Sequence, residues 1–175
     1  MKHKLIIATM SILTLNSCSE KEIATPKTDN FVYSVDRFAD IEVLRYKVPG
    51  FEDLSLKQKE LIYYLSQAAL EGRDILYDQN NKYNLTIRKT LEAIYENYKG
   101  DRNDKEFLAL ECYLKRVWFS NGIHHHYATD KFTPEFSESF FETTVRTLPS
   151  NTLPIQAYDN SVENLIAAIK PVIFD

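Results

Sequence analysis

Apolar residues recur along this chain first at every second position and later at every third or fourth position. Between Ile41 and Val48 they alternate with polar residues, which is typical of a strand with one buried face. From residue 55 onward the spacing is that of helices. The inward-facing residues of the five expected helices are Leu61, Leu65, Ala68 and Ala69, then Ile87, Leu91, Ile94, Tyr95 and Tyr98, then Phe107, Leu110, Leu114 and Val117, then Phe136, Phe140 and Val145, and finally Leu165, Ile166 and Ile169. The pattern predicts a mainly α (α+β) fold of about five helices with one or two short N-terminal strands.

Local signals predict where these helices begin. Ser55 and Gln58 have the spacing of a capping box, in which each side chain bonds to the other residue's backbone N–H. Side-chain oxygens of Asn, Asp and Ser are good helix N-caps, and proline is favoured at the first helical position. The residues expected to start the four later helices are Asn84, Asp104, Thr133-Pro134 and Ser161.

Glycines and prolines predict where the helices end. Gly72 should interrupt the first helix, and Gly100 suits the left-handed position after the second. Asn121-Gly122 should end the third, because both residue types tolerate positive φ. Leu148-Pro149 should end the fourth helix and Pro171 the fifth.

The first residues have the pattern of a secretion signal. Lys2 and Lys4 precede the apolar run Leu5–Leu15, which is too short to span a bilayer. Leu15-Asn16-Ser17-Cys18 then resembles a bacterial lipobox. We therefore expect residues 1–17 to be removed and Cys18 to carry a lipid that anchors the protein in a Gram-negative-type cell envelope, on the periplasmic side or at the surface. The alternative is an ordinary signal peptide with a chance cysteine.

The predicted mature chain has two parts. Residues 18–30 are polar and should form a tether, while residues 31–175 have the length of one ordinary domain. The chain ends on the apolar run 171–174, whereas C-termini are more often polar and frayed. This pattern favours a domain that continues beyond residue 175.

Charge and cysteine content exclude some functions. Residues 1–17 contain two lysines and no acidic residue, so the rest of the chain carries −6 against −4 for the whole sequence. An acidic chain offers no electrostatic footprint for nucleic acid and no basic patch for anionic lipid. With Cys18 acylated, Cys112 has no disulfide partner and is expected to be a small buried apolar residue.

The stretch from Val117 to Pro134 contains the only tryptophan and three of the four histidines. In an extended backbone His124 and His126 share a face and His125 points away, and two ligands are too few for the usual zinc site. We expect these imidazoles to pack or to contact a ligand. Metal capture by a surface lipoprotein is a further hypothesis.

Motifs of the common hydrolases are absent. The sequence contains no H-E-x-x-H, no G-x-S-x-G and no phosphate-binding glycine loop. Glu135, Glu138 and Glu142 share one side of the expected fourth helix, where nothing nearby would desolvate them. They are expected to form a solvated face and not an acid/base pair.

The run Asn121–Pro134, ending in Tyr-Ala-Thr-Asp-Lys-Phe-Thr-Pro, resembles the N-terminal substrate-cleft segment of the dipeptidyl peptidase III family of zinc exopeptidases. Positions that match both the eukaryotic and the bacterial form of that segment are Lys131, Phe132 and Pro134. Positions that depart from it are Tyr127, where the family has phenylalanine, and Thr129-Asp130, which reverses the family's Asp-Thr. The resemblance extends to Tyr63-Tyr64-Leu65 and Glu71-Gly72-Arg73-Asp74, and it covers about the first quarter of such an enzyme.

The resemblance implies a part of a larger two-lobed fold. In that family the upper lobe carries the zinc ligands and the general base in H-E-x-x-G-H and E-E-C-R-A-E/D motifs, and this sequence has neither. Residues 31–175 would form the N-terminal part of the lower lobe, which binds the peptide substrate. The residues implied in substrate binding are Asn121, Gly122, His124, His125, His126 and Tyr127.

Two functions follow from these observations. In the first, the chain contributes a cleft wall to an enzyme that removes dipeptides from peptide N-termini, and the remainder of the enzyme supplies the zinc and all catalytic residues. This chain would then have no catalytic residue, no metal ligand and no activity of its own. In the alternative, it is a self-contained helical lipoprotein that binds a peptide or a partner protein.

Overall fold

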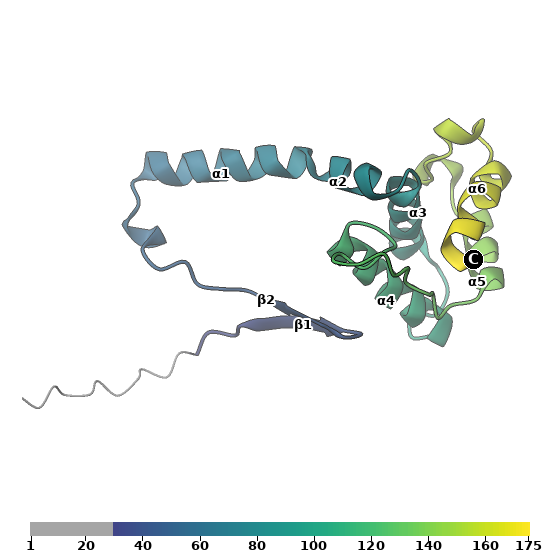
Figure 1. Cartoon of the computed structure of the whole chain (residues 1–175), viewed down its shortest axis with the longest axis horizontal. Helices are drawn as coiled ribbons and strands as arrows, with labels where there is room; N and C mark the ends of the chain where they lie inside the picture. The colour runs from purple at the N-terminus through teal and green to yellow at the C-terminus, as the bar shows by residue number, and fades with distance from the viewer. Residues whose placement is uncertain (1–29) are drawn as a thin grey trace, which may run out of the picture. The chain divides into compact units, whose positions relative to one another are not determined.

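The chain is mainly helical, with a two-stranded antiparallel sheet that precedes the helices, so the predicted fold class is confirmed (Figure 1). The computed structural model describes residues 30–175, of which Tyr33–Asp175 form the unit discussed below. The predicted leader 1–17, the predicted lipidation site Cys18 and nearly all of the tether 18–30 lie outside the described residues. Within the described part, no helix is both long enough and apolar enough to cross a membrane.

The sheet is a hairpin of β1 (Ser34–Phe38) and β2 (Ile41–Leu44), joined by a tight turn in which Ala39 has a φ of 48°. The predicted strand was too long, because it was expected to run to Val48 with Tyr46 on a buried face. Both of these side chains are 71 % exposed. β1 begins at Ser34, so the residues from 46 onward have no strand beside them and the ladder ends.

α1 (Leu56–Glu71) follows a short 3-10 turn and begins as predicted. Ser55 N–H donates to Gln58 Oε1 at 2.9 Å, and Gln58 N–H donates to Ser55 Oγ at 3.4 Å, which together make the capping box. The predicted inward face of this helix is wrong, because no α1 residue is buried by any other described residue. Its large exposed apolar side chains are Leu56, Leu61, Ile62, Tyr63, Tyr64, Leu65 and Leu70.

α2 (Arg73–Asn80) begins directly after Gly72, which interrupts the helical run as predicted. Arg88 of the next helix holds α2 in place. Its Nη1 donates to Asp74 Oδ1 at 2.7 Å, and its guanidinium lies 4.6 Å from the centroid of the buried Tyr77 ring. An arginine that is both paired and stacked satisfies its charge inside a packed region.

α3 (Asn84–Asn97) starts at the predicted place by a different mechanism. Asn84 was expected to be the cap, but it is the first helical residue and its side chain is fully buried. The side chain of Asn81 instead accepts the backbone N–H of Tyr83 at 2.9 Å. Asn84 is therefore available for a contact elsewhere in the fold.

α4 (Lys105–Ser120) is capped by Asp104, as predicted, whose side chain accepts the N–H two residues further on at 2.9 Å. Gly100 does not take the predicted left-handed conformation. It lies under the Tyr98 ring, which a Cβ at this position would overlap. Cys112 was expected to be buried, but it is only half-buried. It forms no disulfide within the described residues.

α5 (Glu138–Thr147) begins four residues later than predicted, so Pro134 is not its first residue. Ser137 is the N-cap because its Oγ accepts the N–H of Phe140 at 3.1 Å. Its own N–H donates to the Glu106 carboxylate at 2.6 Å, which ties the start of α5 to the first turn of α4. Ser137 makes both of these hydrogen bonds, whereas Pro134 has no backbone N–H and no side-chain acceptor with which to make them.

α6 (Val162–Phe174) is capped by Ser161, as predicted, but it does not end at Pro171. The proline lies inside the helix, where it lacks one backbone donor. The helix continues because Ile173 is fully buried and Phe174 packs edge-on against two phenylalanine rings. Burial of Ile173 and partial burial of Phe174 offset one missing hydrogen bond.

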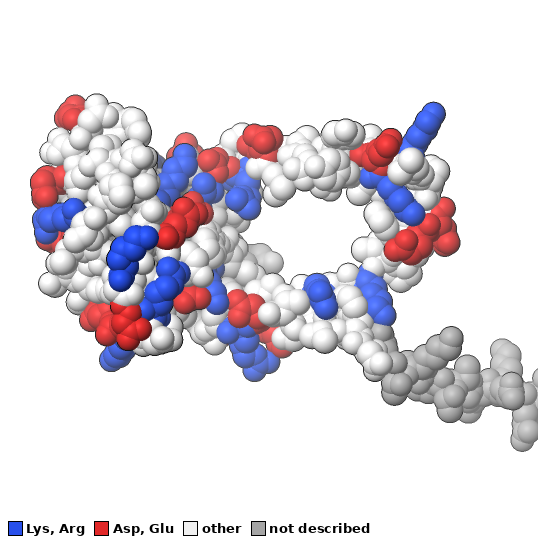
Figure 2. All heavy atoms as spheres, turned by 180° about the vertical axis from the view of Figure 1, so that it is seen from behind, with Lys and Arg blue, Asp and Glu red and all other residues white. Residues whose placement is uncertain are grey.

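The core lies among α3, α4, α5 and α6 (Figure 1). The predicted stripes of the second, third and fifth helices are buried in it, apart from Tyr95 and Tyr98, which are partly buried. Its fully buried members include Ile87, Leu91, Ile94, Phe107, Leu110, Leu114, Val117, Phe141, Val145, Leu165 and Ile169. Lysines and arginines are interspersed with acidic residues on the face drawn in Figure 2.

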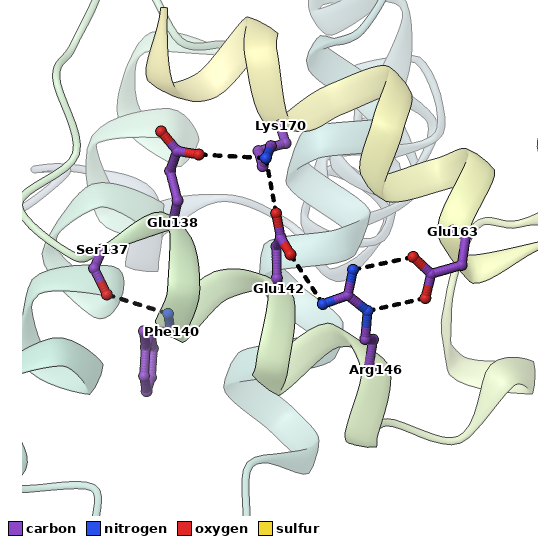
Figure 3. Close-up of polar contacts among 7 residues, drawn as sticks. All are labelled: Ser137, Glu138, Phe140, Glu142, Arg146, Glu163 and Lys170. Carbon is purple, nitrogen blue, oxygen red and sulfur yellow. Dashed lines mark hydrogen bonds and ion pairs between the residues drawn. The ribbon is translucent and has the colours of Figure 1, made fainter.

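Ion pairs connect α5 to α6 on the outside of this core (Figure 3). Lys170 Nζ lies 3.3 Å from Glu138 Oε2 and 2.8 Å from Glu142 Oε1. Arg146 donates to Glu142 at 2.9 Å and to both oxygens of Glu163 at 2.9 and 3.0 Å. The first of the three acidic residues that were expected to share one helix face precedes the helix. The other two are paired, so the predicted solvated face is wrong in part.

Candidate functional site

The candidate site is built from the loop that follows α4. Asn121 ends the helix with a φ of 54°, and Gly122 follows with a φ of 151°, as predicted for this pair. The chain then reverses on itself. His125 N–H donates to Asp130 O at 2.8 Å, and Phe132 N–H donates to Ile123 O at 2.8 Å.

These two hydrogen bonds join the outgoing and returning segments of the loop and leave its tip exposed. Ile123 and Phe132 are buried at its base, whereas Tyr127 at the tip is 90 % exposed. Lys131 Nζ donates to Val172 O at 3.2 Å, so a cation lies beside the C-terminal carbonyls of α6, where the helix dipole favours it. Lys131 thus holds the base of the loop to α6.

A cavity of about 520 Å³ opens beside the loop. All six residues that the resemblance implied in substrate binding line it, together with residues from α2, α3 and α4. The lining residues are Asn80, Asn84, Ser120, Asn121, Gly122, His124, His125, His126, Tyr127, Ala128 and Thr129. A volume of this size is in the range of pockets that bind small ligands.

Asn84 forms part of the cavity wall from within the fold. Its Oδ1 accepts the backbone N–H of Ile123 at 3.2 Å, which fixes the orientation of the amide. The Nδ2 group is then left without a protein partner among the described residues, although Asn84 is 0 % exposed. Gly122 lies against the same amide, and a Cβ at this position would overlap it.

Ser120 is the second buried polar group that lines the cavity. It is 4 % exposed, and its Oγ also has no partner among the described residues. An unpaired buried polar group costs roughly 1–3 kcal/mol. Asn84 Nδ2 is a donor, and Ser120 Oγ is a donor and an acceptor. A ligand that carries carbonyl oxygens would satisfy both of them.

Aromatic rings form the outer wall. The His125 and His126 rings are stacked with centroids 4.5 Å apart, and Phe119 meets His126 edge-on at 5.0 Å. Tyr127 packs against His126 at 4.2 Å. The cavity therefore combines flat rings at its rim with polar groups at its inner surface.

The histidines do not fit a zinc ion. Stacked rings do not direct their nitrogens at one point, and His125 Nδ1 accepts the N–H of Tyr127 at 3.2 Å. In residues 30–175 no group of three or more His, Cys, Asp or Glu side chains is close enough together to hold a metal ion. We therefore derive no zinc chemistry from this loop.

Five lining residues were not predicted as site residues. Ala128 and Thr129 directly follow the predicted ones in the loop, and the other three are Asn80, Asn84 and Ser120. Only Ser120 left a signal in the sequence. Ser120 continues the inward stripe of Leu110, Leu114 and Val117, so a polar side chain on a buried face was readable there. Asn84 was taken for a helix cap, and Asn80 has no distinguishing pattern.

Comparison with known protein families gives no match, and no curated protein matches the chain.

Proposed function

We propose that this chain binds an extended peptide in the cavity beside the 121–132 loop, as part of the substrate cleft of a dipeptidyl peptidase III-like zinc exopeptidase. The observation that carries the binding proposal is the pair of buried polar groups, Asn84 Nδ2 and Ser120 Oγ, which have no partner among the described residues and belong to two residues that line one cavity. A peptide backbone offers a carbonyl oxygen and an N–H at every residue, which are the groups these two atoms need.

The outer wall supports the same ligand. Flat rings such as those of His126 and Tyr127 give a large contact area at a small cost in side-chain entropy. The exposed residues 126–129 offer carbonyl oxygens for further main-chain contacts, whereas the N–H groups of Tyr127 and Ala128 are already bonded within the loop. Binding here supplies orientation, which lowers the barrier of a reaction whose catalytic groups lie elsewhere.

The exposed apolar surface of α1 supports assignment to a larger enzyme. Side chains such as Leu61, Tyr64 and Leu65 are more than half exposed, and contiguous apolar surface of this kind usually contacts other polypeptide. In the proposed enzyme the remainder of the chain would cover α1 and bring the zinc, which would polarise the scissile carbonyl and activate a water molecule.

The alternative is a self-contained helical lipoprotein that binds a peptide or a partner protein. One observation favours it, because the core of α3 to α6 is closed by its own buried side chains. The gene sequence after the Asp175 codon separates the two functions. An in-frame H-E-x-x-G-H motif supports the peptidase, and an immediate stop codon supports the self-contained lipoprotein.

The binding proposal is tested with the 175-residue chain in mild detergent and a neutral, fluorescently labelled pentapeptide of alanine and valine. Fluorescence anisotropy should show saturable binding. Ser120→Ala removes one hydroxyl and should weaken binding about three- to tenfold, which is the range of one hydrogen bond. Asn84→Asp keeps the acceptor for Ile123 N–H but replaces the unpaired donor with an oxygen, so binding should fall further.

Ser139→Ala is the matched control, since Ser139 is an exposed serine on α5 and does not line this cavity. It should bind the pentapeptide like the parent chain. Circular dichroism checks that each variant is folded. No saturable binding by the parent chain, or equal affinities of the folded Ser120→Ala and Asn84→Asp variants and the parent, would refute the proposal.

A further inference from the structure

We infer that the 121–132 loop is acid-sensitive, so that protonation of His125 opens its tip and weakens peptide binding in the cavity beside it. The inference rests on the proposed peptide binding and adds a form of regulation to it. Histidine is the side chain that ordinarily changes charge between about pH 5 and pH 8. Within residues 30–175 all histidines lie in this loop, and all of them line the cavity.

His125 makes the hydrogen bonds that shape the tip of the loop. Its backbone N–H donates to Asp130 O at 2.8 Å, and its carbonyl oxygen accepts the N–H of Ala128 at 3.1 Å. Its ring Nδ1 accepts the backbone N–H of Tyr127 at 3.2 Å. Backbone groups do not titrate in this pH range, so the ring bond is the one that responds to acid.

The ring bond requires a neutral imidazole, which has one N–H and one nitrogen with a free lone pair. Because Nδ1 accepts from Tyr127, the hydrogen of neutral His125 lies on Nε2, and an added proton can bind only at Nδ1. The cation then directs an N–H at the N–H of Tyr127. Protonation therefore replaces a hydrogen bond with a contact between two donors.

The adjacent ring makes the tip more sensitive to acid. The His125 and His126 rings are stacked with centroids 4.5 Å apart, and Tyr127 packs against His126 at 4.2 Å. Two imidazolium cations at such a distance repel each other. All three residues belong to the cavity wall, so separating the rings changes the surface that a peptide would contact.

The elements packed against His125 offer a cationic ring no unpaired carboxylate. A second cavity of about 290 Å³, which His125 also lines, contains Asp40 and Glu42 of the β1–β2 hairpin and Arg116 of α4. Asp40 pairs with Arg116 at 2.6 Å, and Glu42 pairs with Arg37 at 2.7 Å. A protonated His125 would have to displace an arginine to bind either carboxylate.

The remaining neighbours of His125 do not change charge in the same pH range. On the side of the first cavity, α2 and α3 contribute the uncharged amides of Asn80 and Asn84. Within the loop the titratable neighbours besides His126 are Tyr127 and Asp130, and tyrosine and aspartate ordinarily titrate well outside about pH 5–8. A response in this range is therefore a response of the histidines.

The first test measures binding of the 175-residue chain in mild detergent to a pentapeptide of alanine and valine. The peptide is N-acetylated and C-amidated, so it has no titratable group. Isothermal titration calorimetry gives the affinity at about pH 8 and about pH 5.5, on either side of the ordinary histidine range. The affinity of the parent chain should fall about three- to tenfold at the lower pH, the range of one hydrogen bond.

Two variants assign the effect to one ring. His125→Asn keeps an acceptor near the position of Nδ1 that does not titrate, so the ratio of the two affinities should approach one. His124→Asn is the matched control, because it removes a histidine from the same loop and leaves the bond between His125 and Tyr127 in place. It should retain the loss of affinity in acid. Circular dichroism at both pH values checks that each chain is folded.

The second test needs no peptide. In ¹⁵N NMR spectra of the free chain, neutral His125 should be the Nε2–H tautomer, and the Tyr127 amide signal should shift with the same midpoint as the His125 ring. An Nδ1–H tautomer, or a Tyr127 amide that does not follow the ring, would overturn the inference.

The binding outcomes separate the inference from the proposed function. Equal affinities of the parent chain at the two pH values, or a loss that persists in folded His125→Asn, would overturn the acid response alone, and the proposed peptide binding would stand. Tighter binding at about pH 5.5 would also overturn it, because the charged rings would then recruit the peptide and not release it. No binding at either pH would overturn both.

Discussion

Replacing Gly122 with alanine should destabilise the fold more than replacing either of two other glycines. Gly122 has a φ of 151°, which L-residues rarely adopt, and a Cβ would come within 2.7 Å of Asn84 Cγ. The unfavourable backbone conformation costs of order 1–3 kcal/mol. The clash is not relieved cheaply, because Asn84 is buried and its amide is held by Ile123 N–H.

Turning the Asn84 side chain away would break that hydrogen bond and leave a buried N–H unpaired, at a further cost of roughly 1–3 kcal/mol. We expect Gly122→Ala to lower the free energy of unfolding by about 2–6 kcal/mol in total. Such a loss is a large fraction of the roughly 5–15 kcal/mol that stabilises a typical domain.

Two other glycines separate the contributions. Gly50 has a φ of 83° and no atom within 4 Å of an added Cβ, so Gly50→Ala tests the backbone term alone and should cost at most about 1–2 kcal/mol. Gly72 has a φ of −82° and only a van der Waals contact at 3.8 Å. Gly72→Ala should be neutral or stabilise by up to roughly 1 kcal/mol, since alanine is the better helix former.

The measurement is urea unfolding of the three variants and the parent, followed by far-UV circular dichroism, with peptide affinity as a second readout. Only Gly122→Ala should also weaken binding of the neutral pentapeptide, because the Asn84 amide would move. A Gly122→Ala variant within 1 kcal/mol of Gly50→Ala, with parental peptide affinity, would show that the Asn84–Gly122 contact does not shape the cavity.

Three further predictions concern the helices. Pro171→Ala restores a backbone donor inside α6 and should stabilise the chain by about 1–3 kcal/mol in urea unfolding, whereas a loss would mean that the proline ring contributes essential packing. Asp104→Ala removes the α4 cap and should cost about 1 kcal/mol, and Asp104→Asn, which keeps the acceptor, should cost much less. The pKa of Glu163 is lowered from 4.5 by its hydrogen bonds with Arg146, so its contribution to stability is complete above pH 4.5 and is lost as the pH falls through the lowered value. Thermal melts of Glu163→Gln should therefore depend less on pH than those of the parent below pH 4.5, and parallel curves would contradict this.

Features decided within a few residues were predictable from the sequence. The capping box at Ser55 and the caps at Asp104 and Ser161 depend on side chains that bond to their own backbone neighbours. The turn at Asn121-Gly122 depends on two residue types that tolerate positive φ. Pro171 shows the limit of such signals. The ring disfavours a helix locally, but burial of the residues that follow it decides the outcome.

α1 shows a second limit. Its apolar residues predicted an inward face, yet residues 61–65 are apolar on every side of the helix, and none is buried by the described residues. A pattern of this kind indicates that burial of the apolar surface is favourable, but it does not indicate which polypeptide covers that surface. The prediction therefore placed the helix correctly and its packing wrongly.

The cavity beside the 121–132 loop has one part that a local sequence pattern indicated and another part that only the packing of helices creates. Most of its loop residues lie between Asn121 and Tyr127, so a single run of the sequence pointed to that part of the wall. Its inner polar groups come from the start of α3 and the end of α4, which are 36 residues apart and meet only because the helices pack. The two ends of the Asn84 amide differ, since Oδ1 accepts the N–H of Ile123 and Nδ2 has no partner among the described residues. A residue that was readable only as a helix cap thus connects the stability of the loop to the proposed peptide binding, and Gly122→Ala, which should lower both, tests that connection.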